Sequence, residues 1–380
     1  MLSGDHRLAS ATIVGAGCAG LSMAYSLQTR GVCPLVIVDP KDERPDHIWA
    51  YWDDGGEDLS LARHLTEGQW TKWEIVGDNE RVCLKGNHFV YRAISSERFE
   101  THLSGSIPGV ERVQTRVTSV DRNSGAYNLK LESGKELLSK QVFDSRPLFI
   151  PKGAFLQHFL GRRVRTDKPT FDETTATLMD FRVSQEAGIH FIYLLPFSST
   201  EALVESTVFS FQALPDRWYE RQIEHYLSSN YPNVDVKTVS SEKGIIPLIK
   251  TRNEQTIGTP IGVRAGALRA SSGYAFSQIQ RQIFEILDGS EIEVSRLNKI
   301  PRPRGGCNSF ESWMDAVLLR VLQQTPESAP KIFVQLAAAL DGDSFARFMR
   351  GHGDWSGRLR LMKSLPFCLF LKSALCGAIT

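Results

Sequence analysis

The sequence predicts an α/β protein with a parallel α/β domain, a second domain built on an antiparallel sheet, and helices at the C-terminal end. Two short apolar runs, residues 11–14 and 34–38, flank a glycine-rich turn and a helical stretch, which is typical of a βαβ unit in a parallel sheet. The middle third consists of alternating or apolar runs joined by polar turns, and residues from 309 onward have helical periodicity. A chain of 380 residues has room for two such domains.

The first run ends in the pattern G-x-G-x-x-G, formed by Gly15, Gly17 and Gly20, and an apolar helical stretch follows over residues 21–27. The second run ends on Asp39. Strand, glycine turn, helix, strand and acid in this order are typical of a Rossmann-type dinucleotide-binding unit. A glycine-rich turn without a ligand is the alternative for the motif by itself, and the flanking elements favour the dinucleotide.

Each residue of this motif has a physical role in dinucleotide binding. Gly15 permits the tight turn, Gly17 lets the backbone approach a pyrophosphate, and Gly20 lets the helix pack closely on the sheet. The helix N-terminus then faces the phosphates. Asp39 is positioned to accept hydrogen bonds from an unphosphorylated ribose, which favours FAD or NAD over NADP.

The rest of the first domain, residues 8–150, alternates between extended and helical segments. Residues 40–58 are rich in aromatics, among them Trp49 and Trp52, which form either a pocket wall or core. Ser95 or Ser96 caps a helix. The other segments are a helical and then extended stretch at 59–73, one strand at 81–91, a small antiparallel insertion at 113–120, 127–131 and 136–138, and a return to the parallel sheet at 141–146.

The second domain, residues 151–252, is expected to form an antiparallel sheet that binds substrate. Its predicted strands are residues 175–183, 190–196, 202–211 and 244–248, with a polar turn at 197–201 and an amphipathic helix at 218–229.

The chain then returns to the first domain over residues 253–308 and ends in a helical region, 309–380. Residues 261–274 contain small residues, arginines and glycines, including Gly266 and Gly273, and a helix begins near Ala275. This segment is either an ordinary loop or a second contact to a phosphate or a flavin ring.

The charge balance, the cysteine spacing and the apolar runs limit the classes of protein to which this chain can belong. The 44 basic and 43 acidic residues give a net charge of +1, which does not favour a nucleic-acid partner. The six cysteines have no C-x-x-C or metal-ligand spacing and indicate reduced thiols in a cytoplasmic protein without a bound metal. No signal peptide or membrane-spanning run is expected. Residues 365–379, a mostly apolar segment interrupted by Lys372, form either a packed terminal helix or a surface that dips into a bilayer.

The ordered segments resemble the lycopene cyclase family, FAD-containing enzymes that close the end rings of carotenoids. The matching segments are the glycine turn, Asp39 followed by Trp49 and Trp52, and residues 91–92, 143–146, 178–180, 191–196, 203–207, 244–247, 264–266 and 272–274. The resemblance implies a fold like that of flavoprotein hydroxylases and geranylgeranyl reductases, and a lycopene beta-cyclase of bacterial type. It also implies that Arg92, Asp144, Gly266 and Gly273 contribute to FAD binding, although for Asp144 and Arg146 a strand-end salt bridge is an alternative.

The resemblance further implies a redox-neutral cyclisation in which FAD works reduced and NAD(P)H is the external reductant. Glu205, between Leu203-Val204 and Val208-Phe209, is the candidate catalytic acid, because burial keeps a carboxyl protonated near neutral pH. The alternative for Glu205 is an acid on the solvent face of an edge strand. Where the family usually has two adjacent acids, this chain has Glu205 followed by Ser206, so a role of the second acid does not carry over.

The implied substrate is lycopene or another acyclic isoprenoid, and Trp49, Trp52, Tyr193 and Tyr274 are candidate substrate-binding residues. For any one of these rings, packing in the core is the alternative. A substrate as apolar as this would be stored in a bilayer. We therefore expect the protein to contact the inner face of a membrane peripherally. The rival functions are a flavin monooxygenase or prenyl reductase, a cyclase of the same mechanism on a shorter terpenoid, and a non-catalytic FAD-binding or membrane-associated protein.

Overall fold

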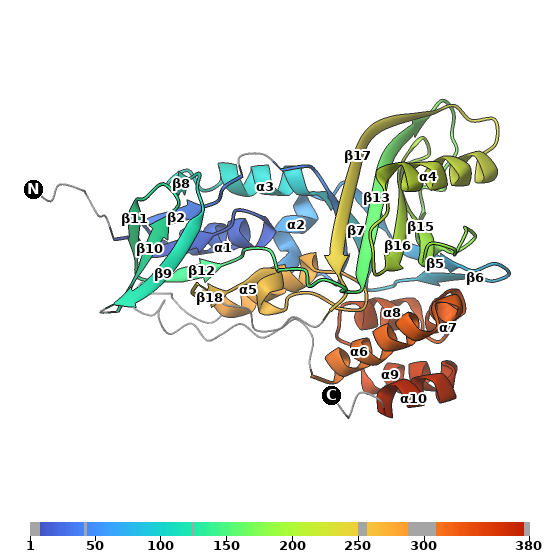
Figure 1. Cartoon of the computed structure of the whole chain (residues 1–380). Helices are drawn as coiled ribbons and strands as arrows, with labels where there is room; N and C mark the ends of the chain where they lie inside the picture. The colour runs from blue at the N-terminus through green and yellow to red at the C-terminus, as the bar shows by residue number, and fades with distance from the viewer. Residues whose placement is uncertain (1–7, 42–43, 124, 250–256, 288–308, 376–380) are drawn as a thin grey trace, which may run out of the picture.

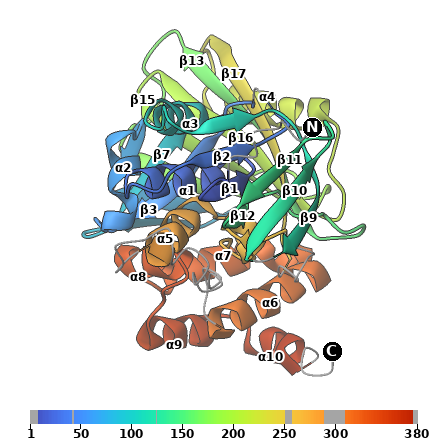
Figure 2. The same cartoon turned by 90° about the vertical axis from the view of Figure 1, so that its left-hand side faces the viewer.

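The computed structural model describes residues 8–41, 44–123, 125–249, 257–287 and 309–375. A parallel α/β half lies at one end of the molecule, a large antiparallel sheet at the other, and the C-terminal helices below that sheet (Figure 1). Turned by 90°, the same helices α6 to α10 lie together on one side of the molecule (Figure 2).

Five strands form the parallel sheet, in the spatial order β18-β12-β1-β2-β8. Their bounds are β1 (Ala11–Val14), β2 (Leu35–Val38), β8 (Glu111–Val113), β12 (Val142–Asp144) and β18 (Thr259–Pro260). The side chains of β1 and β2 are all buried, because both faces of this sheet are covered. Helices α1 (Cys18–Gln28), α3 (Ser96–Gly105) and α5 (Phe276–Leu287) pack together around one apolar core that includes β1 and β2.

A small antiparallel sheet covers the other face of the parallel sheet. It consists of β9 (Val117–Asn123), β10 (Ala126–Leu131) and β11 (Glu136–Ser139), and Leu129 of β10 packs against Val14 and Val142. The predicted parallel sheet and the antiparallel insertion are both confirmed. Of the segment predicted to return to this half, residues 253–308, only 257–287 lie within the described residues.

Seven strands form the large sheet, in the order β17-β13-β16-β15-β14-β5-β6. Their bounds are β5 (Lys72–Val76), β6 (Arg81–Lys85), β13 (Leu156–Thr166), β14 (Thr175–Asp180), β15 (Ile189–Ser198), β16 (Glu201–Ser210) and β17 (Val236–Pro247). All neighbours are antiparallel except β5 and β14. The predicted domain limits stay a prediction, although β5 and β6 come from the first segment and lie in this sheet.

Strand β13 is missing from the sequence prediction because Arg162, Arg163 and Arg165 obscure its apolar alternation. The sheet accommodates these arginines by ion pairs. Arg162 lies 2.9 Å from Glu224 of α4 (Asp216–Asn230), and Arg163 lies 2.6 Å from Glu201.

The single strand expected at residues 81–91 is wrong, since the chain forms β6 and then β7 (Val90–Ser95). Between them the chain turns at residues 86–89, where a Cβ on Gly86 would lie 2.3 Å from the carbonyl oxygen of Phe89. Asp343 Oδ1 accepts hydrogen bonds from the backbone N–H groups of residues 87, 88 and 89 and holds this turn. Strand β7 pairs instead with β3 (Ile48–Asp53) and β4 (Gly68–Trp70) in a three-stranded layer.

The two faces of the large sheet pack against different layers. Val204 and Val208 of β16 pack against α4, whereas Leu203 and Phe209 belong to the core shared with the β3-β7-β4 layer and the C-terminal helices. Because side chains alternate along a strand, odd-numbered residues of β16 face this second core.

The C-terminal helices are α6 (Ser309–Gln324), α7 (Ala329–Ala338), α8 (Gly342–Met349), α9 (Trp355–Ser364) and α10 (Phe367–Leu375). Helix α7 contacts β5 and β6, and two buried ion pairs, Arg269 with Asp315 and Arg358 with Glu311, tie α6 to its neighbours. Within the described ranges, none of the helices has both the length and the apolar character needed to cross a bilayer.

Candidate active site

The glycine turn forms a cradle at the N-terminus of α1. Gly15 has a φ of +101°, and a Cβ on Gly20 would lie 1.9 Å from the Gly15 carbonyl oxygen, so both positions require glycine. Gly17 is the N-cap of α1, and a Cβ there would meet nothing within 4 Å. The tight turn and the close packing predicted for Gly15 and Gly20 are therefore confirmed, and the backbone at Gly17 faces open space.

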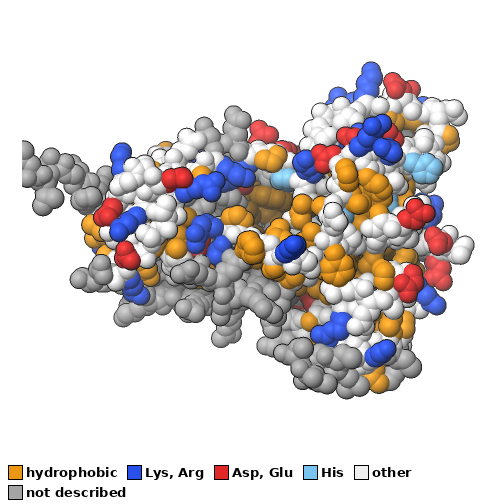
Figure 3. Space-filling model, in the orientation of Figure 1, with side chains coloured by type: hydrophobic (Ala, Val, Ile, Leu, Met, Phe, Trp, Pro, Cys, Tyr) orange, Lys and Arg blue, Asp and Glu red, His pale blue; other side chains and the backbone are white. Residues whose placement is uncertain are grey.

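A cleft of about 830 Å³ opens in front of this turn, at the last residues of β1 and β2 and beside β17. On the face in Figure 3 the surface is hollowed where the two halves of the molecule meet. Among the described residues, one acid, Asp39, and five basic side chains line the cleft: Lys41, Arg44, Arg116, Arg146 and Arg264. The helix N-terminus and this positive charge fit the pyrophosphate of a dinucleotide.

Asp39 lies in this cleft and connects the glycine turn to the residues after β2. Its Oδ2 accepts hydrogen bonds from the Ala16 N–H at 2.7 Å and from Arg44 at 2.6 Å, and its Oδ1 accepts one from the Lys41 N–H at 2.8 Å. A carboxylate offers about four acceptor positions. These three contacts therefore leave acceptor capacity for a ribose hydroxyl.

Asp144 does not line the cleft, because it is fully buried in a salt-bridge cluster. Its carboxylate accepts hydrogen bonds from Arg146 at 2.9 Å and lies 3.6 Å from the Arg264 guanidinium. Asp144 therefore forms the strand-end salt bridge that was the alternative to cofactor binding. Arg146 and Arg264 do line the cleft, so Asp144 acts there indirectly, by orienting these two arginines.

Of the other three residues predicted to bind the cofactor, two lie outside the cleft and one lines it. Arg92 donates to Asp53 at 2.8 Å and to Gln69 at 2.6 Å and does not line the cleft. Gly266, with a φ of +83°, ends the short helix η2 (Gly262–Ala265) and also lies outside the lining. Gly273, with a φ of +71°, lines the cleft next to β17, so it is the member of this group that the structure brings to the cleft at the glycine turn.

Glu205 lies on β16, between β13 and β15, so the alternative of an edge strand is wrong. Its side chain is on the face of Leu203 and Phe209, and the residue is 8% exposed. The Thr207 hydroxyl donates a hydrogen bond of 2.5 Å to Oε1. Burial raises the pKa of Glu205 to about 7, although the bond from Thr207 lowers it. The carboxyl is therefore available in its protonated form near neutral pH.

A cluster of three tyrosines lies beside Glu205. Tyr193 of β15 is the residue paired with Glu205, and the Tyr91 hydroxyl lies 2.7 Å from that of Tyr193 and 2.8 Å from that of Tyr274. Burial raises the pKa of Tyr91 and of Tyr193 well above the usual value, so these hydroxyls stay protonated. The Trp52 ring packs against Tyr91 and Tyr274, with centroids 4.6 and 5.1 Å apart.

Trp49 is not part of this cluster. Its ring stacks on Phe276 at 5.4 Å and packs against the core of the parallel half. Three of the four predicted aromatics therefore meet in or against the tyrosine cluster, and the fourth is a packing residue.

A second buried carboxylate, Glu242, is missing from the sequence prediction. It lies on β17, and it is as buried as Glu205 at 8% exposure. Its neighbours Thr238, Ser240, Ser241 and Lys243 are polar and exposed, and Val239 is exposed too, so this stretch is typical of a loop in front of the predicted strand. The available signal was the alternation that places Glu242, Gly244 and Ile246 on one face of a longer strand.

The sequence model of the family described as "Lycopene cyclase protein" matches residues 11–374. The chain belongs to the lycopene cyclase family. A lycopene beta-cyclase of Pantoea ananas is 24% identical over 374 residues, which is 93% of this chain and 94% of that protein.

Solved structures share the fold at low identity. A geranylgeranyl bacteriochlorophyll reductase-like protein of Thermoplasma acidophilum has a TM-score of 0.61 and 12% identity, with 96% of this chain and 98% of that chain covered. A salicylate hydroxylase has a TM-score of 0.58 and 11% identity, with 93% and 97% covered. A mutant of the halogenase PltM in complex with FAD has a TM-score of 0.52 and 10% identity, with 90% and 79% covered. The predicted fold class is confirmed.

The departure of this chain from the lycopene cyclase pattern, Ser206 after Glu205, lies on the other face of the sheet. Ser206 is fully buried on the α4 side, and its hydroxyl lies 2.9 Å from His190 Nε2. The His190 ring in turn packs against Trp218 of α4. Consecutive residues of a strand point to opposite faces. The serine therefore leaves the Glu205 side of the sheet unchanged.

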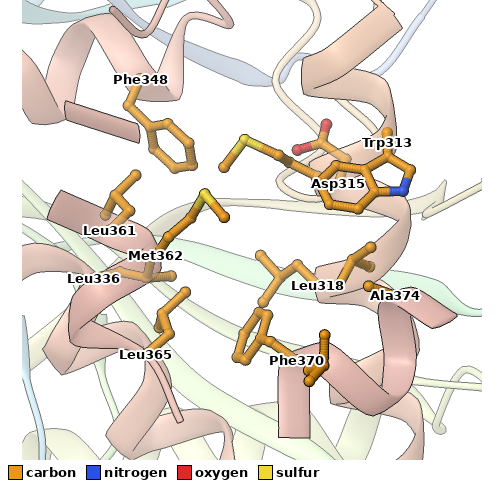
Figure 4. A pocket seen from close by; sticks show the side chains of 13 residues that line it. Trp313, Asp315, Leu318, Leu336, Phe348, Leu361, Met362, Leu365, Phe370 and Ala374 are labelled. Carbon is orange, nitrogen blue, oxygen red and sulfur yellow. The ribbon is translucent and has the colours of Figure 1, made fainter. Parts of the chain in front are cut away.

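Two apolar cavities lie at the C-terminal helices, and the smaller one reaches Tyr274 of the tyrosine cluster. A cavity of about 40 Å³ is lined by Tyr274 and Met179, and it shares Leu318, Leu336 and Phe348 with a larger cavity of about 160 Å³. Figure 4 shows the larger cavity with side chains of α6, α9 and α10 pointing into it. Asp315 is its charged lining residue within the described part of the chain.

Proposed function

We propose that this chain closes a β-ring at the end of an acyclic isoprenoid, with lycopene as the substrate. The observation that carries the proposal is a buried carboxyl, Glu205, on the sheet face that holds the tyrosine cluster. Membership of the lycopene cyclase family and a relative named lycopene beta-cyclase support this assignment.

The reaction begins with a proton transfer from the Glu205 carboxyl to the terminal isopropylidene double bond. The O–H bond breaks, a C–H bond forms, and the neighbouring carbon becomes a tertiary cation. The π electrons of a second double bond then attack this cation, which forms the ring C–C bond and moves the positive charge into the ring. A carboxyl whose pKa lies near the working pH is suited to this first step.

The reaction ends when a ring C–H bond breaks and its electron pair forms the new double bond. The Glu205 carboxylate produced in the first step accepts this proton. The product is an isomer of the substrate, so the balance requires no oxidant and no reductant. The protonated tyrosines and Trp52 exclude water from the cation, and each well-placed ring adds about 0.5 to 2 kcal/mol of cation–π attraction.

We further propose that FAD occupies the cleft at the glycine turn and that NAD(P)H reduces it. Gly17 and the basic lining residues would hold the pyrophosphate of FAD, and Asp39 would accept a hydrogen bond from the FAD ribose. Reduced anionic FAD, when bound, supplies negative charge that stabilises a nearby carbocation. The FAD complex of a halogenase with the same fold supports this choice of cofactor.

We propose that part of the hydrocarbon substrate lies in the apolar cavities. They lie between Tyr274 and the C-terminal helices, which carry five exposed apolar side chains: Trp355 and Leu359, and, at the larger cavity, Trp313, Met362 and Leu371. We propose that these helices contact the inner face of the cytoplasmic membrane peripherally and receive the substrate there. Flotation with liposomes, comparing the full chain with one truncated before Leu365, tests this; equal flotation of both argues against the terminal segment as the anchor.

The test of the reaction is an anaerobic assay with chemically reduced FAD and lycopene in heavy water. We expect a cyclic product that contains deuterium, with the flavin still reduced at the end, and no product from Glu205→Gln. Stoichiometric oxidation of NAD(P)H with product formation would instead indicate a monooxygenase or a prenyl reductase. Full activity of Glu205→Gln would remove Glu205 from the mechanism, and conversion of only shorter terpenoids would change the substrate.

A further inference from the structure

Glu242 and Glu205 lie on the same face of the large sheet with a glycine between them. Strand β13 separates β17 from β16, and its residue Gly161 is the partner of both Glu242 and Glu205 in the register. Paired residues of neighbouring strands point to the same face. The two carboxyl side chains therefore flank a residue that has no side chain.

The Glu242 side chain lies next to the position that a Cβ on Gly161 would occupy. A Cβ on Gly161 would lie 3.2 Å from Glu242 Cγ and 3.3 Å from its Oε1, and 3.1 Å from Leu203 Cδ1. The Ile48 N–H donates a hydrogen bond of 2.7 Å to Oε2 and fixes the other end of the carboxyl. An alanine at position 161 would therefore crowd the Glu242 side chain.

No cation of the described residues neutralises this pair at close range. His47 Nδ1 lies 3.8 Å from Glu242 Oε2, but burial lowers the His47 pKa and keeps the ring neutral near pH 7. From the segment before β3 the nearby charge is that of Asp46, which raises the pKa of Glu242. From β15 and β7 the groups are the protonated Tyr193 and Tyr91. Burial, with Glu205 as the next cause, raises the pKa of Glu242 to about 8.

We propose that Glu242 is a positioning residue for the reaction of Glu205: the two carboxyls share one proton across Gly161, so that Glu205 is held ready to donate it. Two buried carboxyls on either side of one glycine cannot both ionise easily, so one proton remains on the pair. After ring closure the pair takes up one proton again. This inference rests on the proposed function for its role in catalysis, whereas the sharing of a proton is a property of the folded chain itself.

Infrared titration of the purified full chain tests the sharing without any substrate. In Glu242→Gln the side-chain amide still accepts from the Ile48 N–H, so the fold is retained. We expect the protonated-carboxyl band of the pair to titrate at lower pH in either single glutamine variant, because each loses its like-charged neighbour. Glu242→Asp keeps a carboxyl and should titrate between the wild type and Glu242→Gln. Glu201→Gln, on the same strand as Glu205 but ion-paired to Arg163, is the matched control and should leave the band unchanged.

The pH dependence of kcat/KM with lycopene tests the catalytic role. Glu242→Gln should move the alkaline limb down by about one pH unit, which is about tenfold lower activity at pH 8 and little change at pH 6. An equal loss at all pH values would indicate a merely structural role and overturn the proposal. Independent titration of the two carboxyls would also overturn it, even if lycopene is cyclised. Coupled titration without conversion of lycopene by the wild type would instead refute the proposed function.

Discussion

The burial of Glu205 predicts an unusual pH dependence of stability. In the folded chain its pKa is about 7, against about 4.5 for an exposed glutamate. Between these values the folded state binds more protons at this site than the unfolded state, so the free energy of unfolding falls as the pH rises. The contribution of Glu205 is fully present below pH 4.5 and is lost as the pH rises through about 7.

The magnitude follows from the displacement of the pKa. A shift from 4.5 to about 7, at roughly 1.4 kcal/mol for each unit, corresponds to roughly 3 kcal/mol. Glu205→Gln removes this dependence, and it lowers the pKa of Glu242 because it removes the charge of Glu205. The wild type should therefore lose about 3 kcal/mol relative to the glutamine variant between pH 4.5 and pH 8.

Urea unfolding of both proteins at several pH values measures this difference. Glu201→Gln is a control of opposite sign, because hydrogen bonds from Arg165 and Arg163 outweigh partial burial and lower the pKa of Glu201. That variant should differ from the wild type most above pH 5 and least in acid. A pH-independent difference between wild type and Glu205→Gln would show that Glu205 titrates as an exposed acid, and the argument from burial would fail.

Three further substitutions test separate parts of the structure. Gly20→Ala brings a Cβ to 1.9 Å from the Gly15 carbonyl oxygen, so we expect a loss of several kcal/mol in thermal unfolding and of bound flavin absorbance. Tyr91→Phe removes a buried hydroxyl that lies between two partly buried tyrosines and should cost about 1 to 3 kcal/mol by urea unfolding. Asp315→Asn leaves the buried guanidinium of Arg269 without its charged partner and should cost about 3 to 5 kcal/mol in the same assay.

Control substitutions elsewhere in the chain separate these effects from a non-specific loss of stability. Gly105→Ala, in α3, adds a Cβ that meets nothing within 4 Å and should keep flavin and stability. Tyr127→Phe, in the small insertion sheet, is the control for Tyr91→Phe. Unchanged stability of Gly20→Ala would contradict the close contact between α1 and the turn, and unchanged stability of Asp315→Asn would contradict the buried ion pair.

Local patterns predicted the parts of the fold in which neighbours in the sequence are also neighbours in space. The βαβ unit, the cap of α3 and the hairpin of β15 and β16 were all predicted correctly, because each depends on a few consecutive residues. Strand β13 was missed because ion pairs across the sheet decide where its arginines lie.

The sequence by itself determined the glycine cradle, the family and Glu205 as the candidate acid, because these depend on residue identity and short spacing. Only the tertiary structure decided which side chains accompany that acid. Strand register placed Gly161 between Glu205 and Glu242, alternation turned Ser206 toward α4, and the β3-β7-β4 layer brought Tyr91 to Tyr193. These neighbours come from strands far apart in the chain, and their meeting depends on the pairing and packing of whole sheets, which no local pattern of residues specifies.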